Sequence, residues 1–325
     1  MASLQGIKKR LQGVRNINQM TSAMELVAAT KMRRSQEVAL ASRAYALTAF
    51  EILANLVEGL VAMGNPDVAT KDVFNPSNFP LLKQRTVRKT AVLVVAADKG
   101  LAGSFNSAVF KKLESFIVNG QLSTVNCQFI AVGTKAIDYL RRRNLPVDAT
   151  YTRQGDSVRL AEVEPIANHL IDGYIAGRWD RVVVFSTHFM SALRQEVVMR
   201  QLLPIDFNKI RATLEEIIPE TGRFSELRRK IIESRPTRPI EYLIEPSPEV
   251  ALNQLLPLLS KMQVYHLMLE ANASEHSARR MAMKNASDNA GELIGDLTRE
   301  YNRSRQASIT REIIEITSTA AALKR

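Results

Sequence analysis

Four histidines are the residues in this chain whose side chains could bind a metal or act as a catalytic base. They are His169, His188, His266 and His276, and their spacing matches no metal site, since neither His-Glu-x-x-His nor a pair of cysteines occurs. Ser186-Thr187-His188 combines hydroxyls with an imidazole, but adjacent strand residues point to opposite faces, so we interpret it as a polar cluster in a loop. The sequence predicts no metal and no catalytic residue.

Phosphate-binding signatures are also missing from the sequence. No Gly-Lys pair occurs, and Gly133-Thr134-Lys135 is the nearest approach to a phosphate-binding loop. The run from Asp98 to Asn106 follows a strand-like segment, but its glycine spacing differs from that of dinucleotide sites, so we expect a tight turn of small residues. The mid-helix run Glu275-His276-Ser277-Ala278-Arg279-Arg280 is interpreted as a solvated helix face. We therefore expect no cofactor.

The composition favours a folded, helix-rich protein that contains no disulfide. Hydrophobic residues make up 46% of the 325 residues and aromatic residues only 6%, so aliphatic side chains must build the core. The lone cysteine, Cys127, lies in an apolar run and is expected to be a buried thiol. The net charge is +11, and residues 1–50 carry eight basic against two acidic residues, so the excess lies mainly in the N-terminal arm.

Both ends of the chain have the pattern of long helices. No proline occurs before Pro66, and apolar residues recur at helical spacing, which predicts an N-terminal helix over residues 1–65. After Pro257 no further proline occurs, and residues 249–325 are predicted to form a C-terminal helix that Gly291 and Gly295 soften. Each helix carries too thin an apolar stripe to be stable alone.

The middle of the chain has the pattern of an α/β domain. Residues 66–86 carry turn-forming residues and are predicted to be a linker, whereas residues 87–207 alternate strand-like and helix-permitting segments. Residues 208–248 contain helix-breaking prolines and are expected to be an inserted excursion followed by a short foot segment. The three predicted strands are Ala91 to Ala97, Val125 to Val132 and Arg181 to Thr187.

The predicted fold class is α/β plus long helices, with a mostly parallel, Rossmann-like sheet between the two terminal helices. The apolar faces of those helices are most simply buried if the two helices pack against each other as an antiparallel coiled coil. If the C-terminal helix is the longer, its last turns project past the N-terminal start and require a foreign apolar surface. The sequence thus favours a mechanical part over a catalyst.

Long segments at both ends carry a family resemblance. The run from Met20 to Arg34 resembles the N-terminal signature of the gamma subunit of F-type ATP synthases. The runs Ala273 to Ala290 and Tyr301 to Ile313 are similar to that family's C-terminal helix, and Glu241 to Pro246 also resembles a family segment. The likeness weakens between Asn208 and Arg238. With a single cysteine, the chain cannot form the dithiol switch of plastid members.

The resemblance implies a central shaft that turns inside a hexamer of alpha and beta subunits and couples rotation of a membrane proton ring to ATP synthesis. Met24 and Arg279 resemble residues that meet acidic loops of the beta subunits, and the apolar C-terminal tip would turn in a smooth sleeve. Contacts with the hexamer are implied for Met24, Lys31, Arg34, Arg279, Arg305, Gln306, Thr310, Ile313, Ile316 and Leu323. Contacts with the membrane ring of c subunits are implied for Tyr242 and Glu245. An epsilon subunit is a further implied partner.

Two other classes of function compete with this interpretation. A nucleic-acid-binding scaffold would use the positive charge, but the sequence has no aromatic stacking platform and no reading motif, so we expect no nucleic acid. A nucleotide-dependent enzyme built on the α/β domain would show activity in the isolated chain. No signal peptide and no apolar run of 18 residues occur, so we expect a peripheral protein on the cytoplasmic face of the bacterial plasma membrane, with no direct membrane insertion.

Overall fold

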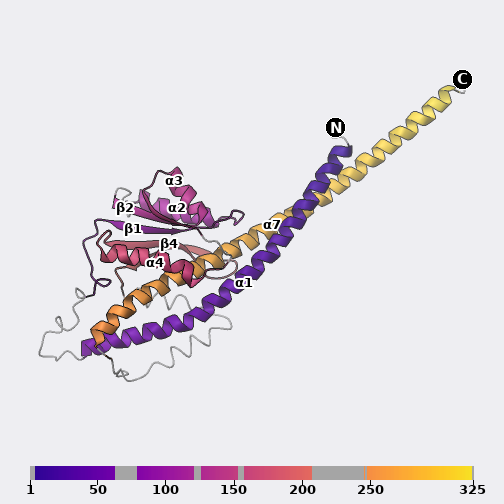
Figure 1. Ribbon diagram of the computed structural model, residues 1–325. Helices are drawn as coiled ribbons and strands as arrows, with labels where there is room; N and C mark the ends of the chain where they lie inside the picture. Colours follow the sequence, from indigo (N-terminus) through magenta and orange to yellow (C-terminus); the bar gives the residue numbers. More distant parts are fainter. Residues whose placement is uncertain are drawn as a thin grey trace. The chain divides into compact units, whose positions relative to one another are not determined.

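The two longest helices are α1 (Leu4–Ala62) and α7 (Pro248–Leu323), as predicted for the two ends of the chain. The structure is a computed structural model that describes residues 4–62, 79–120, 126–152, 157–206, 245 and 247–323. α7 starts at a proline, which suits the first helical position, and continues through Pro257, Gly291 and Gly295 without a break. Figure 1 draws α1 in indigo and α7 from orange to yellow.

The chain divides into two compact units, and both long helices contribute to each. The first unit contains residues 1–30 and 279–325, and the second contains residues 31–278. Because α1 and α7 are continuous helices, each passes from one unit into the other.

A five-stranded sheet forms the centre of the second unit, in the order β3-β2-β1-β4-β5. Strands β1 to β4 are parallel, and β5 pairs antiparallel with β4. Leu93 of β1 is level with Ile130 of β2 and Val184 of β4. The bounds are β1 (Thr90–Val95), β2 (Cys127–Val132), β3 (Val147–Tyr151), β4 (Arg181–Phe189) and β5 (Gln195–Leu203).

The three predicted strands are confirmed as the three central strands, whereas the two edge strands were not predicted. β1, most of β2 and the part of β4 from Val182 to Phe185 are buried apolar runs, which a sequence displays directly. Strands β3 and β5 are partly exposed and mix polar with apolar residues, so their hydrophobic pattern is weak. The helices between the strands are α2 (Phe105–Val118), α3 (Thr134–Arg142) and α4 (Leu160–Ile175). The short, basic α3 was also missed.

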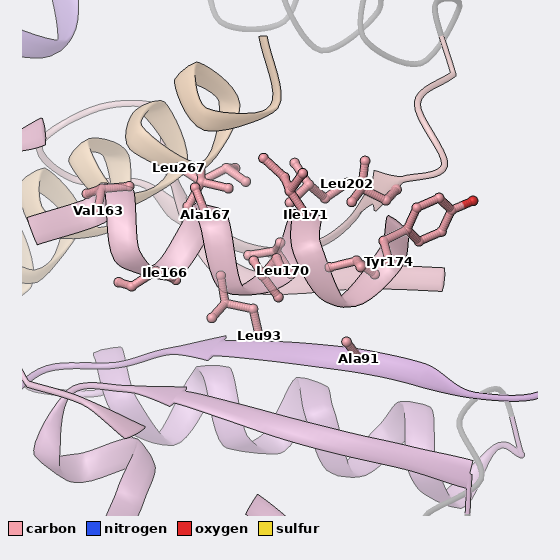
Figure 2. Close-up of a cluster of buried hydrophobic side chains, with 14 of the residues drawn as sticks. Ala91, Leu93, Val163, Ile166, Ala167, Leu170, Ile171, Tyr174, Leu202 and Leu267 are labelled. Atoms are coloured by element: carbon pink, nitrogen blue, oxygen red, sulfur yellow. The ribbon is translucent and has the colours of Figure 1, made fainter. Parts of the chain in front are cut away.

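Two apolar layers enclose this sheet. Val92 and Val94 face a layer that α2 and α3 supply, whereas Ala91 and Leu93 face the layer of α4 and α7. Figure 2 shows the second layer, with Leu170 and other side chains of α4 directed at β1. The predicted burial of Cys127 is confirmed. Phe79, Leu81 and Leu82, from the segment before β1, are also buried in the second layer.

Part of α7 is a central helix of the second unit. From Val264 to Ser277 its residues are buried, apart from the half-buried Tyr265. Leu267 packs in the layer beneath the sheet, while Asn272 accepts a hydrogen bond from Ser35 of α1 at 2.6 Å. A helix that is buried on all sides transmits displacement directly to its neighbours, because a close-packed interior does not deform smoothly.

Candidate functional site

In the first unit, α1 and α7 pack antiparallel through a small apolar seam. Residues near the start of α1 contact residues near the end of α7, and each later residue of α1 contacts an earlier residue of α7. The seam contains Ile7, Leu11, Val14, Ile294, Leu297 and Tyr301. The antiparallel pairing predicted from the sequence is therefore present.

A chain of hydroxyl and amide groups crosses between the same two helices. Ser287 donates to Asn18 Oδ1 at 2.7 Å, and its oxygen lies 2.7 Å from the hydroxyl of Ser22. Because the proton of Ser287 is already used, Ser22 must be the donor in its bond to Ser287. Hydrogen bonds require specific distances, so this chain fixes the register of two helices whose apolar seam is short.

We expect Ser287→Ala to destabilise the helix pair by about 1 kcal/mol, because it removes both interhelical hydrogen bonds from partly buried groups. Thermal unfolding followed by circular dichroism measures the effect. Ser308→Ala is the matched control, since Ser308 donates to Glu312 within its own exposed helical turn. Equal melting curves for the two variants would show that the chain does not stabilise the register.

α7 continues past the seam as an exposed helix. Residues 302–323 follow the last seam residue, Tyr301, and at ~1.5 Å per residue they extend for about 33 Å. Arg305, Gln306 and Thr310 are exposed on this tip. Its large apolar side chains are also exposed, at 47% for Ile309, 55% for Ile313, 59% for Ile314 and 69% for Ile316. Leu323 lies at the helix end, and its side chain is outside the described part.

The other residues predicted to meet the hexamer lie in both units. Met24 is half-buried on α1 and Arg279 is buried on α7, both in the first unit. Since Ser22 meets Ser287, the register places Arg279 one to two helical turns from Met24 along the pair. Lys31 and Arg34 belong to the second unit, where Lys31 is half-buried and Arg34 exposed.

The two residues assigned to the membrane ring are only partly described. Glu245 is exposed in a bend shortly before α7. Tyr242 and the excursion over residues 208–238 lie outside the described residues. Both assignments therefore stay predictions.

The run from Glu275 to Arg280 is not a solvated face, which corrects the interpretation from the sequence. Glu275, His276 and Ser277 are 5%, 4% and 1% exposed, and Arg279 is 9% exposed. Charged residues at helical spacing suggested solvent, but most of these side chains are buried, and Arg280 is half-buried. Tertiary packing decides which side of a charged helix meets water.

A buried charge cluster joins α7 to the antiparallel strands, and nothing in the sequence analysis predicted it. Glu270 of α7 is 2% exposed, and its carboxylate lies 2.9 Å from His188 Nδ1 of β4 and 3.3 Å from Arg200 Nη1 of β5. His266, one turn earlier on α7, approaches the same carboxylate through Nε2 at 3.2 Å. The i,i+4 spacing of His266 and Glu270 was the only sequence signal, and such pairs are common on surfaces.

The cluster keeps Glu270 ionised. Burial alone would raise the pKa of the carboxyl, but the hydrogen bonds from His188 and His266 outweigh burial and hold the pKa of Glu270 well below the usual carboxyl range. An ionised carboxylate can only accept, so both imidazole nitrogens that face it must carry protons. In the described part of the chain, Nδ1 of His266 is buried without a hydrogen-bond partner. The arrangement therefore favours the tautomer of His266 that is protonated at Nε2.

The run Ser186-Thr187-His188 lies inside β4 and not in a loop, which is a second correction. Ser186 and Thr187 are buried, and neither hydroxyl oxygen has a hydrogen-bond partner among the described residues. Alternation along β4 places Ser186 and His188 on the α7 side and Thr187 on the α2 side. His188 is thus engaged by Glu270.

The carboxyl ends of β1 and β4 form the position at which doubly wound sheets usually bind ligands. Here Ala278 of α7 packs against Ala97, Ala102 and Phe105 at the end of β1. Asp98 accepts hydrogen bonds from the backbone and hydroxyl of Thr134 at 3.0 and 3.2 Å, so it caps α3. Ala102 and Phe105 of this turn thus serve internal packing and Asp98 serves capping, whereas Leu101 is 62% exposed.

The close approach of two backbones beside this turn depends on a glycine. A side chain at Gly133, whose φ is +93°, would place its Cβ 2.1 Å from the carbonyl oxygen of Ala96. The first turn of α3 therefore lies directly against the end of β1.

The described residues contain no group of three or more His, Cys, Asp or Glu side chains placed to hold a metal ion. Among the same residues, no helix is both long and apolar enough to cross a membrane.

Comparison with known sequences identifies full-length relatives. A family model described as ATP synthase matches residues 3–323. The ATP synthase gamma chain of Cyanothece sp. (strain PCC 7425) is 39% identical over 327 residues, with complete coverage of both chains. The ATP synthase gamma chain of Roseiflexus sp. (strain RS-1) is 37% identical over 324 residues, with 99% of each chain covered.

Comparison with solved structures identifies the same fold at lower sequence identity. A chain of the Euglena gracilis mitochondrial ATP synthase aligns with a TM-score of 0.60 and 17% identity, covering 98% of this chain and 94% of that one. A central-stalk chain of the Tetrahymena thermophila mitochondrial ATP synthase aligns with a TM-score of 0.55 and 24% identity, covering 82% and 99%. The combination of terminal helices and a Rossmann-like sheet is therefore shared with these chains.

Proposed function

The chain belongs to the family of ATP synthase gamma chains, and on that premise we propose that it is the central rotor shaft of a proton-translocating ATP synthase. As a subunit of that complex, it couples rotation of the membrane ring to conformational change in the hexamer of alpha and beta subunits. A shaft that lacks threefold symmetry contacts three equivalent sites differently, and this difference in contact energy shifts their conformations.

One observation carries this proposal beyond family membership. The tip of α7 exposes Ile309, Ile313, Ile314 and Ile316 on a helix that has already left its partner α1. Exposed apolar side chains that gather on one element mark an interaction surface. A smooth apolar sleeve would cover such a tip without hydrogen bonds that oppose rotation.

We assign the polar and cationic residues to contacts that differ between rotary positions. In this proposal Arg305, Gln306 and Thr310 bond the ring of alpha and beta subunits, where the fork of an arginine can bind a carboxylate bidentately. Met24 and Arg279 approach acidic loops of the beta subunits, and Lys31 and Arg34 also contact the hexamer. Tyr242 and Glu245 contact the polar loops of the membrane ring, near an epsilon subunit.

We further propose that this subunit is not itself catalytic. Binding and hydrolysis of nucleotide would belong to the neighbouring subunits, while this chain supplies rigidity and asymmetric contacts. The purified chain alone should then hydrolyse no ATP. Hydrolysis by the isolated chain would favour a nucleotide-dependent enzyme, and co-purifying nucleic acid would favour a helical scaffold of another class.

The direct test is purification of the tagged chain from its native membranes. Recovery of alpha-like and beta-like subunits with ATPase activity is the expected result, with the subunits identified by mass. A variant truncated after Tyr301 is the matched comparison, since it keeps the seam but removes the exposed tip. We expect the truncated variant to co-purify with less of the alpha-like and beta-like subunits than the full chain. Equal recovery of these subunits would contradict the role of the tip.

We expect Met24→Lys to impair coupling more than assembly. A lysine at this half-buried position would form a charge-assisted hydrogen bond with a partner carboxylate in one rotary state, stabilising that state by about 1–3 kcal/mol. ATP synthesis per transported proton should fall severalfold while subunit recovery stays normal. Met20→Lys, one turn earlier and exposed, is the control. Synthesis per proton equal to that of the wild type would disprove the contact.

The proposed location is the cytoplasmic face of the bacterial plasma membrane, where the chain is held by its partner subunits. Membership in the family makes it part of a membrane-associated complex, and its sequence relatives include those from Cyanothece and Roseiflexus. Fractionation tests this placement. The chain should sediment with membranes in the presence of the ring and remain in the supernatant when the ring is deleted.

A further inference from the structure

α7 presents a polar stripe to the β4–β5 pair, where helices in a protein core normally present apolar side chains. His266, Glu270, Ser274 and Ser277 follow one another at spacings of four, four and three residues, so they share one face of the helix. All four are buried, with exposures of 8%, 2%, 0% and 1%. This face is therefore polar, although it is removed from water.

The stripe meets both antiparallel strands through directed contacts. Glu270 binds His188 of β4 at 2.9 Å and Arg200 of β5 at 3.3 Å. Two turns further along α7, the hydroxyl of Ser277 donates to the carbonyl of Ala192 in the β4–β5 connection at 2.6 Å. The side-chain amide nitrogen of Gln195 donates a hydrogen bond to the same hydroxyl at 3.2 Å. The two contact points hold α7 at two positions along its axis.

Directed contacts and apolar contacts respond differently to a load along the helix. Interdigitated apolar side chains also resist a slide, but their contacts are non-directional, so a repacked neighbour can replace one that is lost. Hydrogen bonds between charged groups hold only within a narrow range of distance and angle, and a slide of about 1 Å breaks them. A polar stripe therefore adds a position-specific resistance to axial and rotational slip that apolar packing alone does not supply.

Building such a stripe carries a cost that packing alone would not justify. Buried ion clusters are often no more stabilising than apolar side chains of the same volume, because the charges must be removed from water. Specificity of position is the property that a buried polar group supplies and an apolar one does not. The stripe thus points to a need for one fixed position of α7 on the sheet.

We propose that Glu270 is the positioning residue that fixes α7 on β4 and β5, so that torque passes between the α/β domain and the helix without slip. The inference rests on the proposed function, since it assigns a mechanical role within the shaft. Glu270 acts through the placement of α7 and contacts no substrate.

The test separates fixing a position from merely stabilising the fold. In the decisive variant all four charged or titratable members of the cluster become apolar: His188→Leu, Arg200→Met, His266→Leu and Glu270→Met. Side-chain volumes are approximately kept and the charges of the cluster are removed together, so stability should be retained. The control is Glu164→Gln, which breaks the exposed pair of α4 and α7 between Glu164 and Lys261.

The readout uses the complete complex in inverted membrane vesicles. We expect the apolar variant to hydrolyse ATP within about twofold of the wild type when the proton gradient is collapsed by an uncoupler, because no load then opposes rotation. Proton pumping per ATP hydrolysed against a gradient should fall at least threefold, while Glu164→Gln pumps normally. Wild-type pumping by the apolar variant would overturn the inference.

A second variant covers the case in which the apolar variant fails to assemble. Glu270→Asp keeps the charge but shortens the side chain by one methylene, so it cannot reach His188, Arg200 and His266 together. Normal hydrolysis with reduced pumping would support the inference, and normal pumping would overturn it. A wild-type chain that forms no pumping complex would contradict the proposed function, and the inference would fail with it. If the wild-type complex pumps protons and both variants pump equally well, the inference is contradicted and the proposed function stands.

Discussion

Gly173→Ala is expected to destabilise the α/β domain by about 3 kcal/mol, because the added methyl group meets the ring of Trp179. The new Cβ would lie 1.9 Å from Cζ2 of Trp179, which no pair of atoms tolerates without a shift. Trp179 is fully buried, and its indole nitrogen donates to the carbonyl of Leu170 at 3.1 Å. The gain of ~1 kcal/mol that alanine brings to a helix interior is too small to compensate.

Urea unfolding followed by tryptophan fluorescence measures this effect, since Trp179 is the single tryptophan in the sequence. Gly100→Ala is the matched control, because an added Cβ there has no heavy atom within 4 Å and the backbone is not in the left-handed region. The control should unfold within about 0.5 kcal/mol of the wild type. Unfolding of Gly173→Ala at the same urea concentration as the control would show that α4 and Trp179 leave room for a methyl group.

Glu270→Gln is expected to reduce the free energy of unfolding by about 3–5 kcal/mol at neutral pH, because it removes the buried carboxylate that His188, Arg200 and His266 share. The pKa of Glu270 is lower in the folded chain than in the unfolded chain. Its stabilising contribution is therefore fully present above the unfolded pKa, about 4.3, and is lost as the pH falls towards the folded value. From about pH 5 downward, the difference between wild type and variant should narrow.

Urea midpoints measured at pH 7, 5 and 3 provide the comparison. Glu164→Gln serves as the control, since its carboxylate is half exposed and pairs with Lys261. An exposed pair contributes less than about 1 kcal/mol, so this variant should remain close to the wild type at each pH. A stability difference for Glu270→Gln that stays constant down to pH 3 would show that the carboxylate does not supply the stabilisation.

The fold was predictable from the sequence wherever one element displays its own pattern. The absence of proline and the helical spacing predicted α1 and most of α7, and the apolar runs predicted β1, β2 and β4. β3, β5 and α3 were missed because edge strands and a short basic helix expose much of their surface, which weakens the hydrophobic period. The family was recognisable because both terminal helices carry specific residues over long segments.

One part of the candidate site was predictable from the sequence and another part was not. The exposed tip of α7 was predicted, because a helix longer than its partner must extend beyond it. The Glu270 cluster was missed because its members come from β4, β5 and α7, whose adjacency depends on the strand order and not on spacing along the chain.

The sequence by itself determined the two terminal helices, the three central strands and the family of this protein, since each depends on residues that are neighbours along the chain or share one helical face. Only the tertiary structure decided that the charged run from Glu275 to Arg279 is buried and that His188 lies against Glu270. A local pattern shows which residues share a face but not what covers that face, and burial determines whether a charge is solvated or must find a partner.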